Sequence, residues 1–147
     1  MVKTKKIPKY LRVADSGKNP SIDKKIISEL EGKPAWQVQF IDLDGRWSWL
    51  NLESDQLIDD ILPSLKNFES MDWNEILGRN NHAITIDRII SDAKRRLRDL
   101  KHDDTDSLIS LRLTGKKRIW GIKVGHVLKL LWWDPQHEIC PSLLRYT

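Results

Sequence analysis

The fold is decided by residues 107–139, which read SLISLRLTGKKRIWGIKVGHVLKLLWWDPQHEI. In the first part of this stretch, apolar residues alternate with polar ones, the period-2 pattern of a half-buried strand. Two further apolar runs, 118–123 and 127–133, are separated by glycine-containing turns, as in β-hairpins. The dipeptide Asp134-Pro135 ends the last run, because proline cannot donate a hydrogen bond to a neighbouring strand. We therefore predict a meander of three strands.

Before the meander, the apolar residues recur at helical spacing. A helix is predicted over 54–68, with Ser54 as its N-cap, and Pro63 should kink or divide it. The clearest helix is predicted over 85–100, where the apolar positions lie three or four residues apart. Its apolar stripe consists of Ile86, Ile89, Ala93, Leu97 and Leu100.

Shorter elements are predicted between and before these helices. Alternation over 36–43 indicates a strand, Asp44-Gly45 is a turn signal, and 46–52 is predicted to return as a second strand. One or two helical turns are expected over 72–78, with Trp73 facing inward. We expect the tryptophans of this region to pack in or around the core. One residue of the pair Trp132-Trp133 should lie in the core and the other at its rim.

Length and composition indicate one globular α+β domain over 34–147 after a basic arm over 1–33, which has room for one short helix. The chain has 147 residues, 39% of them hydrophobic, and seven tryptophans. We predict an antiparallel sheet of about four strands packed against two or three helices. Residues 1–20 should be mobile or ordered by a partner, since their few apolar groups cannot offset the ordering entropy.

The sequence gives no sign of a membrane span, a secretory signal or a cofactor site, so a cytoplasmic protein without cofactors is expected. Cys140 is the single cysteine, and it is interpreted as a packing residue rather than a nucleophile. The four histidines show no metal-ligand spacing. His102 and the aspartates that follow it are interpreted as a solvated loop, and no metal site is predicted.

Charge is distributed unevenly along the chain. The net charge is +4 overall, but it is +5 over residues 1–33, −7 over 34–75 and +6 over 76–147. This asymmetry favours a basic surface that attracts polyanions, with an acidic surface elsewhere.

Arg112, Arg118 and His137 are the candidate catalytic residues, and the meander and its end carry all three. Metal-free cleavage of RNA requires a base to activate the 2′-OH, cations to stabilise the charged intermediate, and an acid to protonate the leaving 5′ oxygen. Arginine suits the second role because its fork matches phosphate oxygens. Histidine suits proton transfer because its pKa lies near neutrality.

The stretch from Leu100 to His137 resembles the C-terminal half of the RelE/YoeB-like mRNA interferases, which are toxins of type II toxin–antitoxin pairs. The shared pattern is Leu100-Lys101-His102, an arginine about ten residues later, a second arginine six residues after it, and a histidine near the C-terminus. The resemblance implies the RelE-like order β-α-α-β-β-β. It also implies a metal-independent endoribonuclease that cleaves mRNA at the ribosome and that an antitoxin protein neutralises.

By this resemblance, Arg112 and Arg118 correspond to the phosphate-binding arginines and His137 to the acid. The expected RNA contacts are Lys101, His102, Lys116, Lys117 and Arg95. The family's glutamate base has no counterpart between Glu75 and Glu138, so Asp99, Asp103 or His102 would have to replace it. Two alternatives stay open: a basic binding module of the same fold without catalysis, and a ParE-type toxin directed at gyrase.

Convergence of the two arginines depends on the hairpin between them. Side chains alternate along a strand, so Arg112 and Arg118 share a face only if the connecting loop has an odd number of residues. A three-residue loop Gly115–Lys117, which would pair Thr114 with Arg118, meets this condition. A two-residue loop would send the arginines to opposite faces.

Overall fold

A five-stranded mixed sheet lies at the centre of the computed structural model, which describes residues 32–141. The strands follow the order β1-β5-β4-β3-β2 across the sheet. The meander supplies β3 (Ser107–Arg112), β4 (Arg118–Val124) and β5 (Val127–Asp134), which pair antiparallel to one another. The predicted α+β class and the three-stranded meander are therefore confirmed. The predicted arm lies outside the described residues, except for Gly32 and Lys33.

The two outer strands differ from the predictions. β1 (Ala35–Gln37) has three residues and pairs with β5 in parallel, so the sheet is not purely antiparallel. β2 (His82–Thr85) was missed and pairs antiparallel with β3 at the other edge. The predicted strand over 46–52 is wrong, because this segment bends and then forms the 3₁₀ turn η1 (Trp49–Asn51). The observed order of elements thus includes a strand between the two predicted helices.

The first predicted helix is one continuous element of three parts, α3 (Ser54–Gln56), η2 (Leu57–Ile61) and α4 (Leu62–Phe68). η2 is a π-helical turn, in which the amide of Leu62 donates to the carbonyl of Leu57. It ends two residues before Pro63, whose missing N–H and bulky ring disfavour a regular α-turn there. The expected irregularity at Pro63 is therefore a π-turn. The N-cap is Glu53 rather than Ser54.

The second predicted helix begins later than predicted. Residues before it form β2 and the 3₁₀ turn η3 (Ile86–Arg88), and α6 extends over Ser91–Asp99. α6 ends in a Schellman motif. In that motif His102 N donates to Leu97 O at 2.8 Å, and Lys101 N donates to Arg98 O at 3.0 Å. Lys101 has a φ of 65°, in the left-handed region that glycine usually occupies at this position.

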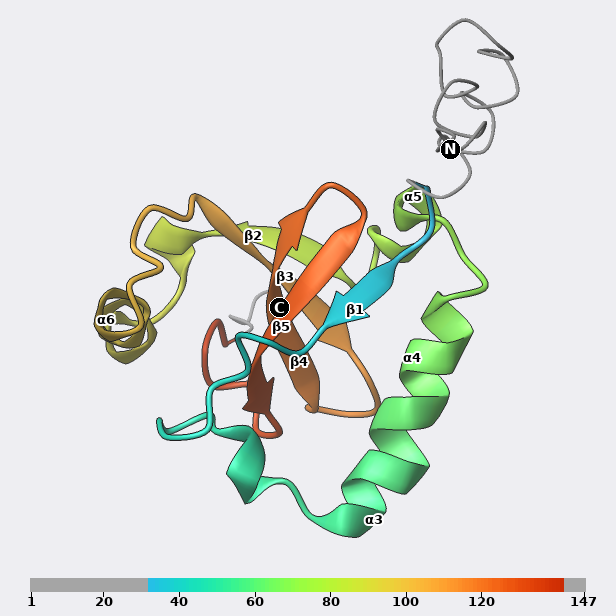
Figure 1. Cartoon of the computed structure of the whole chain (residues 1–147), viewed down its shortest axis with the longest axis horizontal. Helices are drawn as coiled ribbons and strands as arrows, with labels where there is room; N and C mark the ends of the chain where they lie inside the picture. Colours follow the sequence, from blue (N-terminus) through green and yellow to red (C-terminus); the bar gives the residue numbers. More distant parts are fainter. Residues whose placement is uncertain (1–31, 142–147) are drawn as a thin grey trace, which may run out of the picture.

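Helices lie on both sides of the sheet (Figure 1), and each face of the sheet carries its own core. On the first face, α4 and the short helix α5 (Trp73–Ile76) cover a cluster that includes Leu111, Ile119 and Trp133. On the second face, α6 covers a cluster that includes Trp120 and Trp132. Both Trp132 and Trp133 are almost fully buried, so the prediction that one lies at the rim is wrong.

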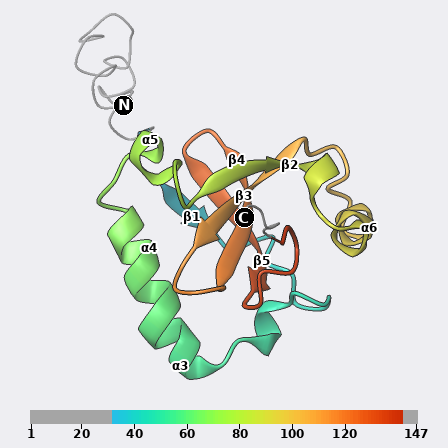
Figure 2. The same ribbon diagram turned by 180° about the vertical axis from the view of Figure 1, so that it is seen from behind.

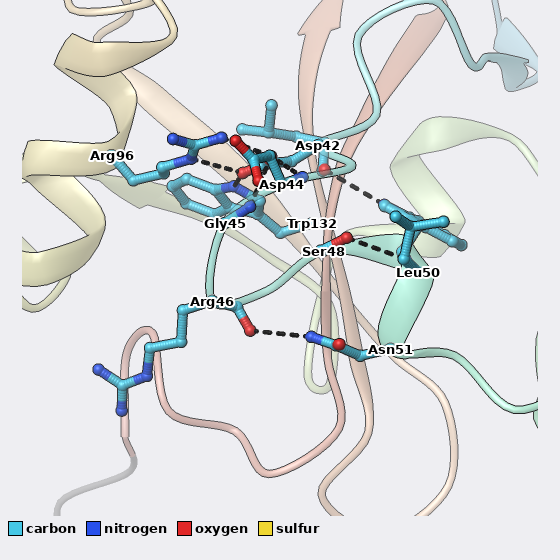
Figure 3. Close-up of polar contacts among 11 residues, drawn as sticks. Asp42, Asp44, Gly45, Arg46, Ser48, Leu50, Asn51, Arg96 and Trp132 are labelled. Carbon is cyan, nitrogen blue, oxygen red and sulfur yellow. Dashed lines mark hydrogen bonds and ion pairs between the residues drawn. The ribbon is translucent and has the colours of Figure 1, made fainter.

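A buried ion pair fastens α6 and the segment before η1 to the sheet. Asp42 accepts two hydrogen bonds of 2.8 Å from the guanidinium of Arg96 and one of 3.0 Å from Trp132 Nε1 (Figure 3). It also accepts hydrogen bonds from the backbone amides of Asp44 and Gly45. These two residues form the predicted turn, but no strand over 46–52 follows it. Burial raises the pKa of Asp42, but the hydrogen bonds outweigh burial and lower this pKa to about 2.

Candidate functional site

Arg112 and Arg118 lie directly opposite each other on β3 and β4. The hairpin closes through a hydrogen bond of 3.0 Å from Leu113 N to Lys117 O, which leaves a three-residue loop, Thr114–Lys116. The predicted odd loop is therefore confirmed, although its register is shifted so that Arg118 faces Arg112 instead of Thr114. Both arginines project from the second face of the sheet, the one that α6 covers further along.

The two guanidinium groups form a cationic cluster without a direct ion pair among the described residues, although the carboxylate of Asp134, the cross-strand neighbour of Arg118, acts to raise the pKa of Arg118. Within residues 32–141, no aspartate or glutamate lies within ion-pair distance of either arginine. Arg112 donates to Asn80 Oδ1 at 3.2 Å, and Arg118 donates to the carbonyls of Gly115 and Lys117. Since a guanidinium has five N–H donors, both arginines keep donors for an anion. Burial, followed by the nearby Arg112, lowers the pKa of Arg118.

His137 lies beside this pair, on the segment that follows β5. That segment turns back along the same side of the sheet as α6 (Figure 2). Burial lowers the pKa of His137 below its usual 6.5, and the charges of Arg118 and Arg112 lower it further. The structure therefore brings together Arg112, Arg118 and His137, as predicted. In the free protein the imidazole is neutral at pH 7.

A buried aspartate determines where His137 lies. Asp134 pairs with Arg118 across the strands, and its carboxylate accepts hydrogen bonds from Trp120 Nε1 at 3.1 Å, Glu138 N at 2.8 Å and Ile139 N at 3.1 Å. His137 adopts a φ of 58° so that the two amides after it point to this carboxylate. Burial raises the pKa of Asp134 despite these hydrogen bonds. Asp134 thus holds the turn, and its oxygens are already occupied.

Asn80 and Asn81 hold Arg112 from the other side. Asn81 is buried, accepts a hydrogen bond of 2.7 Å from Arg112 N, and donates one of 2.9 Å to Ile76 O. These asparagines and Asp134 were not predicted as site residues. Long-range contacts place them, and no local spacing in the sequence signals such contacts.

The predicted contacts Lys101 and His102 do not join the cluster. They end α6 near the opposite end of the sheet, where the ring of His102 packs edge-on against Phe40 with 5.3 Å between centroids. Lys129, which pairs with Ile122, also lies over Phe40. Ile122 is four positions along β4 from Arg118, so about 13 Å separates these regions. Asp99 and Asp103 flank the same helix end and are equally remote from the arginines.

The remaining predicted RNA contacts divide between paired and free cations. Lys117 forms a 2.8 Å ion pair with Asp60 of η2 and so faces the first side of the sheet. Arg95 pairs with Asp92 within α6. Lys116 is exposed in the hairpin loop next to Arg118, with no ion pair among the described residues. Of these three residues, Lys116 alone has no ion-pair partner within residues 32–141.

Two other findings concern Cys140 and the helices of the described region. Burial raises the thiol pKa of Cys140, and this disfavours the thiolate that a nucleophile requires. No helix within residues 32–141 is long and apolar enough to cross a membrane.

Comparisons of the chain with protein-family models, with curated proteins and with solved structures found no match. The chemistry of the cluster is therefore the basis for a functional assignment.

Proposed function

We propose that this protein is a metal-independent endoribonuclease whose site consists of Arg112, Arg118 and His137. The observation that carries the proposal is the cross-strand pair of arginines, which form no direct ion pair within residues 32–141 and whose charges reach His137. Two like charges held together in this way are stabilised when an anion binds between them. A phosphodiester provides that anion, and its oxygens match the planar donors of arginine.

The proposed reaction is attack of the ribose 2′-hydroxyl oxygen on the adjacent phosphorus, which breaks the bond from phosphorus to the 5′ oxygen, while a water molecule accepts the 2′-hydroxyl proton. The products are a 2′,3′-cyclic phosphate and a 5′-hydroxyl end. The arginines stabilise the additional negative charge that develops on the phosphorus oxygens. His137 is neutral in the free protein, but a bound phosphate offsets the two charges that lower its pKa. We expect this pKa to rise in the complex, so that His137 protonates the leaving oxygen.

The resemblance to RelE/YoeB-like interferases extends the proposal to a biological setting. The RNA would be mRNA, with cleavage at the ribosome, and a partner protein would neutralise the activity as an antitoxin. The positive charges of exposed Arg112 and half-buried Arg118 support an acidic inhibitor, because complementary charge accelerates association.

A second candidate is a phosphate-binding module that grips RNA without cutting it. This candidate is favoured by the lack of a base in the described part of the site. Asp134 is fully hydrogen-bonded, and Asp99, Asp103 and His102 lie at the far end of the sheet. Binding by arginine and histidine needs no base, whereas cleavage needs one or a bound water that replaces it.

The test compares cutting and binding with the same RNA. End-labelled single-stranded RNA is incubated with the protein in EDTA, and the product ends are analysed for a 2′,3′-cyclic phosphate. Arg118→Ala should reduce cleavage about a hundredfold, which corresponds to the loss of one preorganised charge contact. Lys66→Ala, an exposed charge removed from α4 on the other face, serves as the control.

The outcomes separate the two candidates. If the wild type binds RNA through Arg112 and Arg118 but leaves it intact, also with ribosomes present, the binding module is correct. If Arg118→Ala retains its fold and full cleavage, the assignment of the site is wrong.

A further inference from the structure

The cationic cluster belongs to a longer row of groups at one end of the sheet. Arg112, Arg118 and Asp134 are neighbours across β3, β4 and β5, and the turn before β2 continues the row on the outer side of β3. Neighbouring strands lie about 4.8 Å apart, so each strand adds one step of this length. A ligand that crosses the strand ends therefore meets polar side chains from four consecutive segments.

The turn before β2 is built to stay in this position. Gly78 N donates to Asn81 O at 2.9 Å and closes the turn, and the buried side chain of Asn81 fastens it to both α5 and β3. Asn80, at the tip of the turn, accepts the hydrogen bond from the guanidinium of Arg112. The turn and the site are therefore joined by direct contacts.

Arg79 shares the tip of this turn with Asn80. It is exposed, and no carboxylate in residues 32–141 forms an ion pair with it. Arg79 therefore adds a positive charge to the row. It lies before β2, which is one strand further from β4 than the strand that carries Arg112. Several exposed cations of the described region are paired, such as Lys33, Arg46 and Arg95, but what distinguishes Arg79 from the other unpaired ones is its place beside Asn80, which contacts Arg112.

We infer that Arg79 binds a second phosphate of the same nucleic-acid strand, so that the substrate is a single strand that crosses the ends of β2, β3, β4 and the segment after β5. This inference rests on the proposed function, because it takes the cluster of Arg112, Arg118 and His137 as the site of the first phosphate. It gives the site a footprint of several nucleotides. It also assigns Arg79 to binding and not to the reacting atoms.

The footprint predicts how binding depends on RNA length. A dinucleotide has one phosphodiester, so Arg79→Ala and the wild type should bind it equally. A single strand of five nucleotides has four phosphodiesters, and Arg79→Ala should bind it about fivefold more weakly at 0.1 M salt. The slope of log K against log salt concentration should fall by about 0.7, the value for one contact with a single strand. In a cleavage assay, KM should rise while kcat stays unchanged.

Controls separate this inference from the proposed function. Lys66→Ala removes one exposed charge on the opposite side of the sheet and should leave both the affinity and the slope unchanged. A five-nucleotide DNA should show the same loss with Arg79→Ala, because the contact is to phosphate. If the wild type binds the five-nucleotide RNA and Arg79→Ala has the wild-type slope, the footprint is refuted and the proposed function stands. If the wild type binds neither RNA, both are refuted.

Discussion

Replacing Asp42 with asparagine should destabilise the fold by an amount that depends on pH. The pKa of Asp42 lies at about 2 in the folded protein, compared with 3.8 for an ordinary aspartate. Each pKa unit corresponds to 1.36 kcal/mol, so the ionised form contributes about 2.4 kcal/mol to the free energy of unfolding. The carboxylate is almost completely buried, so solvent screens this contribution little. The contribution is fully present above pH 3.8 and is lost as the pH falls through 2.

At neutral pH the cost of Asp42→Asn should exceed this figure. The substitution also leaves the guanidinium of Arg96, only 22% exposed in its side chain, without its anion. Removing one partner of such a pair typically lowers the free energy of unfolding by about 3–5 kcal/mol. Urea denaturation followed by tryptophan fluorescence, at pH values from 7 down to 2, measures the free energy of unfolding of both proteins.

The difference between the two proteins isolates Asp42 from other acids. Asp134 has a raised pKa, so its contribution has the opposite sign, with stability gained as the pH falls through its folded pKa. This contribution is common to the wild type and the variant and cancels in the difference. The difference should therefore stay constant above pH 4 and shrink by about 2 kcal/mol towards pH 2. A difference that is independent of pH, or that grows in acid, would refute the role assigned to the Asp42–Arg96 pair.

Three further predictions concern backbone strain and protonation. Lys101→Gly should raise the free energy of unfolding by about 1 kcal/mol in a denaturation assay, because glycine relieves the positive φ at this position. The same substitution should leave RNA binding unchanged, and a loss of binding would show that Lys101 belongs to the site. His137→Gly should keep the free energy of unfolding within about 1 kcal/mol of the wild type, since the φ of His137 is also positive. Cleavage should fall at least about a hundredfold, and unimpaired cleavage would exclude His137 as the acid. The pKa of His137, measured by NMR, should lie below 6.5 in the free protein and rise when inorganic phosphate or a dinucleotide binds, and an unchanged value would place the anion elsewhere.

The parts of the structure that were predictable are those with local signals. Alternation and glycine turns define β3, β4 and β5, and the odd hairpin loop places Arg112 and Arg118 on one face. β2 was missed because only one of its four residues is buried, so no alternation stands out. The predicted strand over 46–52 failed because Trp47 and Trp49 alternate with polar residues but pack against different faces of the sheet.

The contacts that position the site could not be predicted from local sequence patterns. Arg96 lies outside the predicted apolar stripe of its helix, and no sequence pattern links it to Asp42, 54 residues away, with which the structure pairs it. The pair Lys101-His102 matched a sequence motif of the interferases, yet in this fold it ends a helix. Asn80, Asn81 and Asp134 acquire their roles only when β2, β3 and β5 are assembled.

The parallel pairing of β1 with β5 has a consequence for the order of folding. β4 and β5 join through a tight turn, and so do β3 and β4, so these three strands can assemble from contacts that are close in sequence. Ala35, in contrast, pairs with Val127, and this contact closes a loop of about ninety residues. Closing so long a loop is entropically costly and slows the step that depends on it. During synthesis β1 must wait for β5 to leave the ribosome, and the turn that carries His137 emerges later still. We therefore expect the growing chain to complete its cationic cluster only after the rest of the sheet has been made.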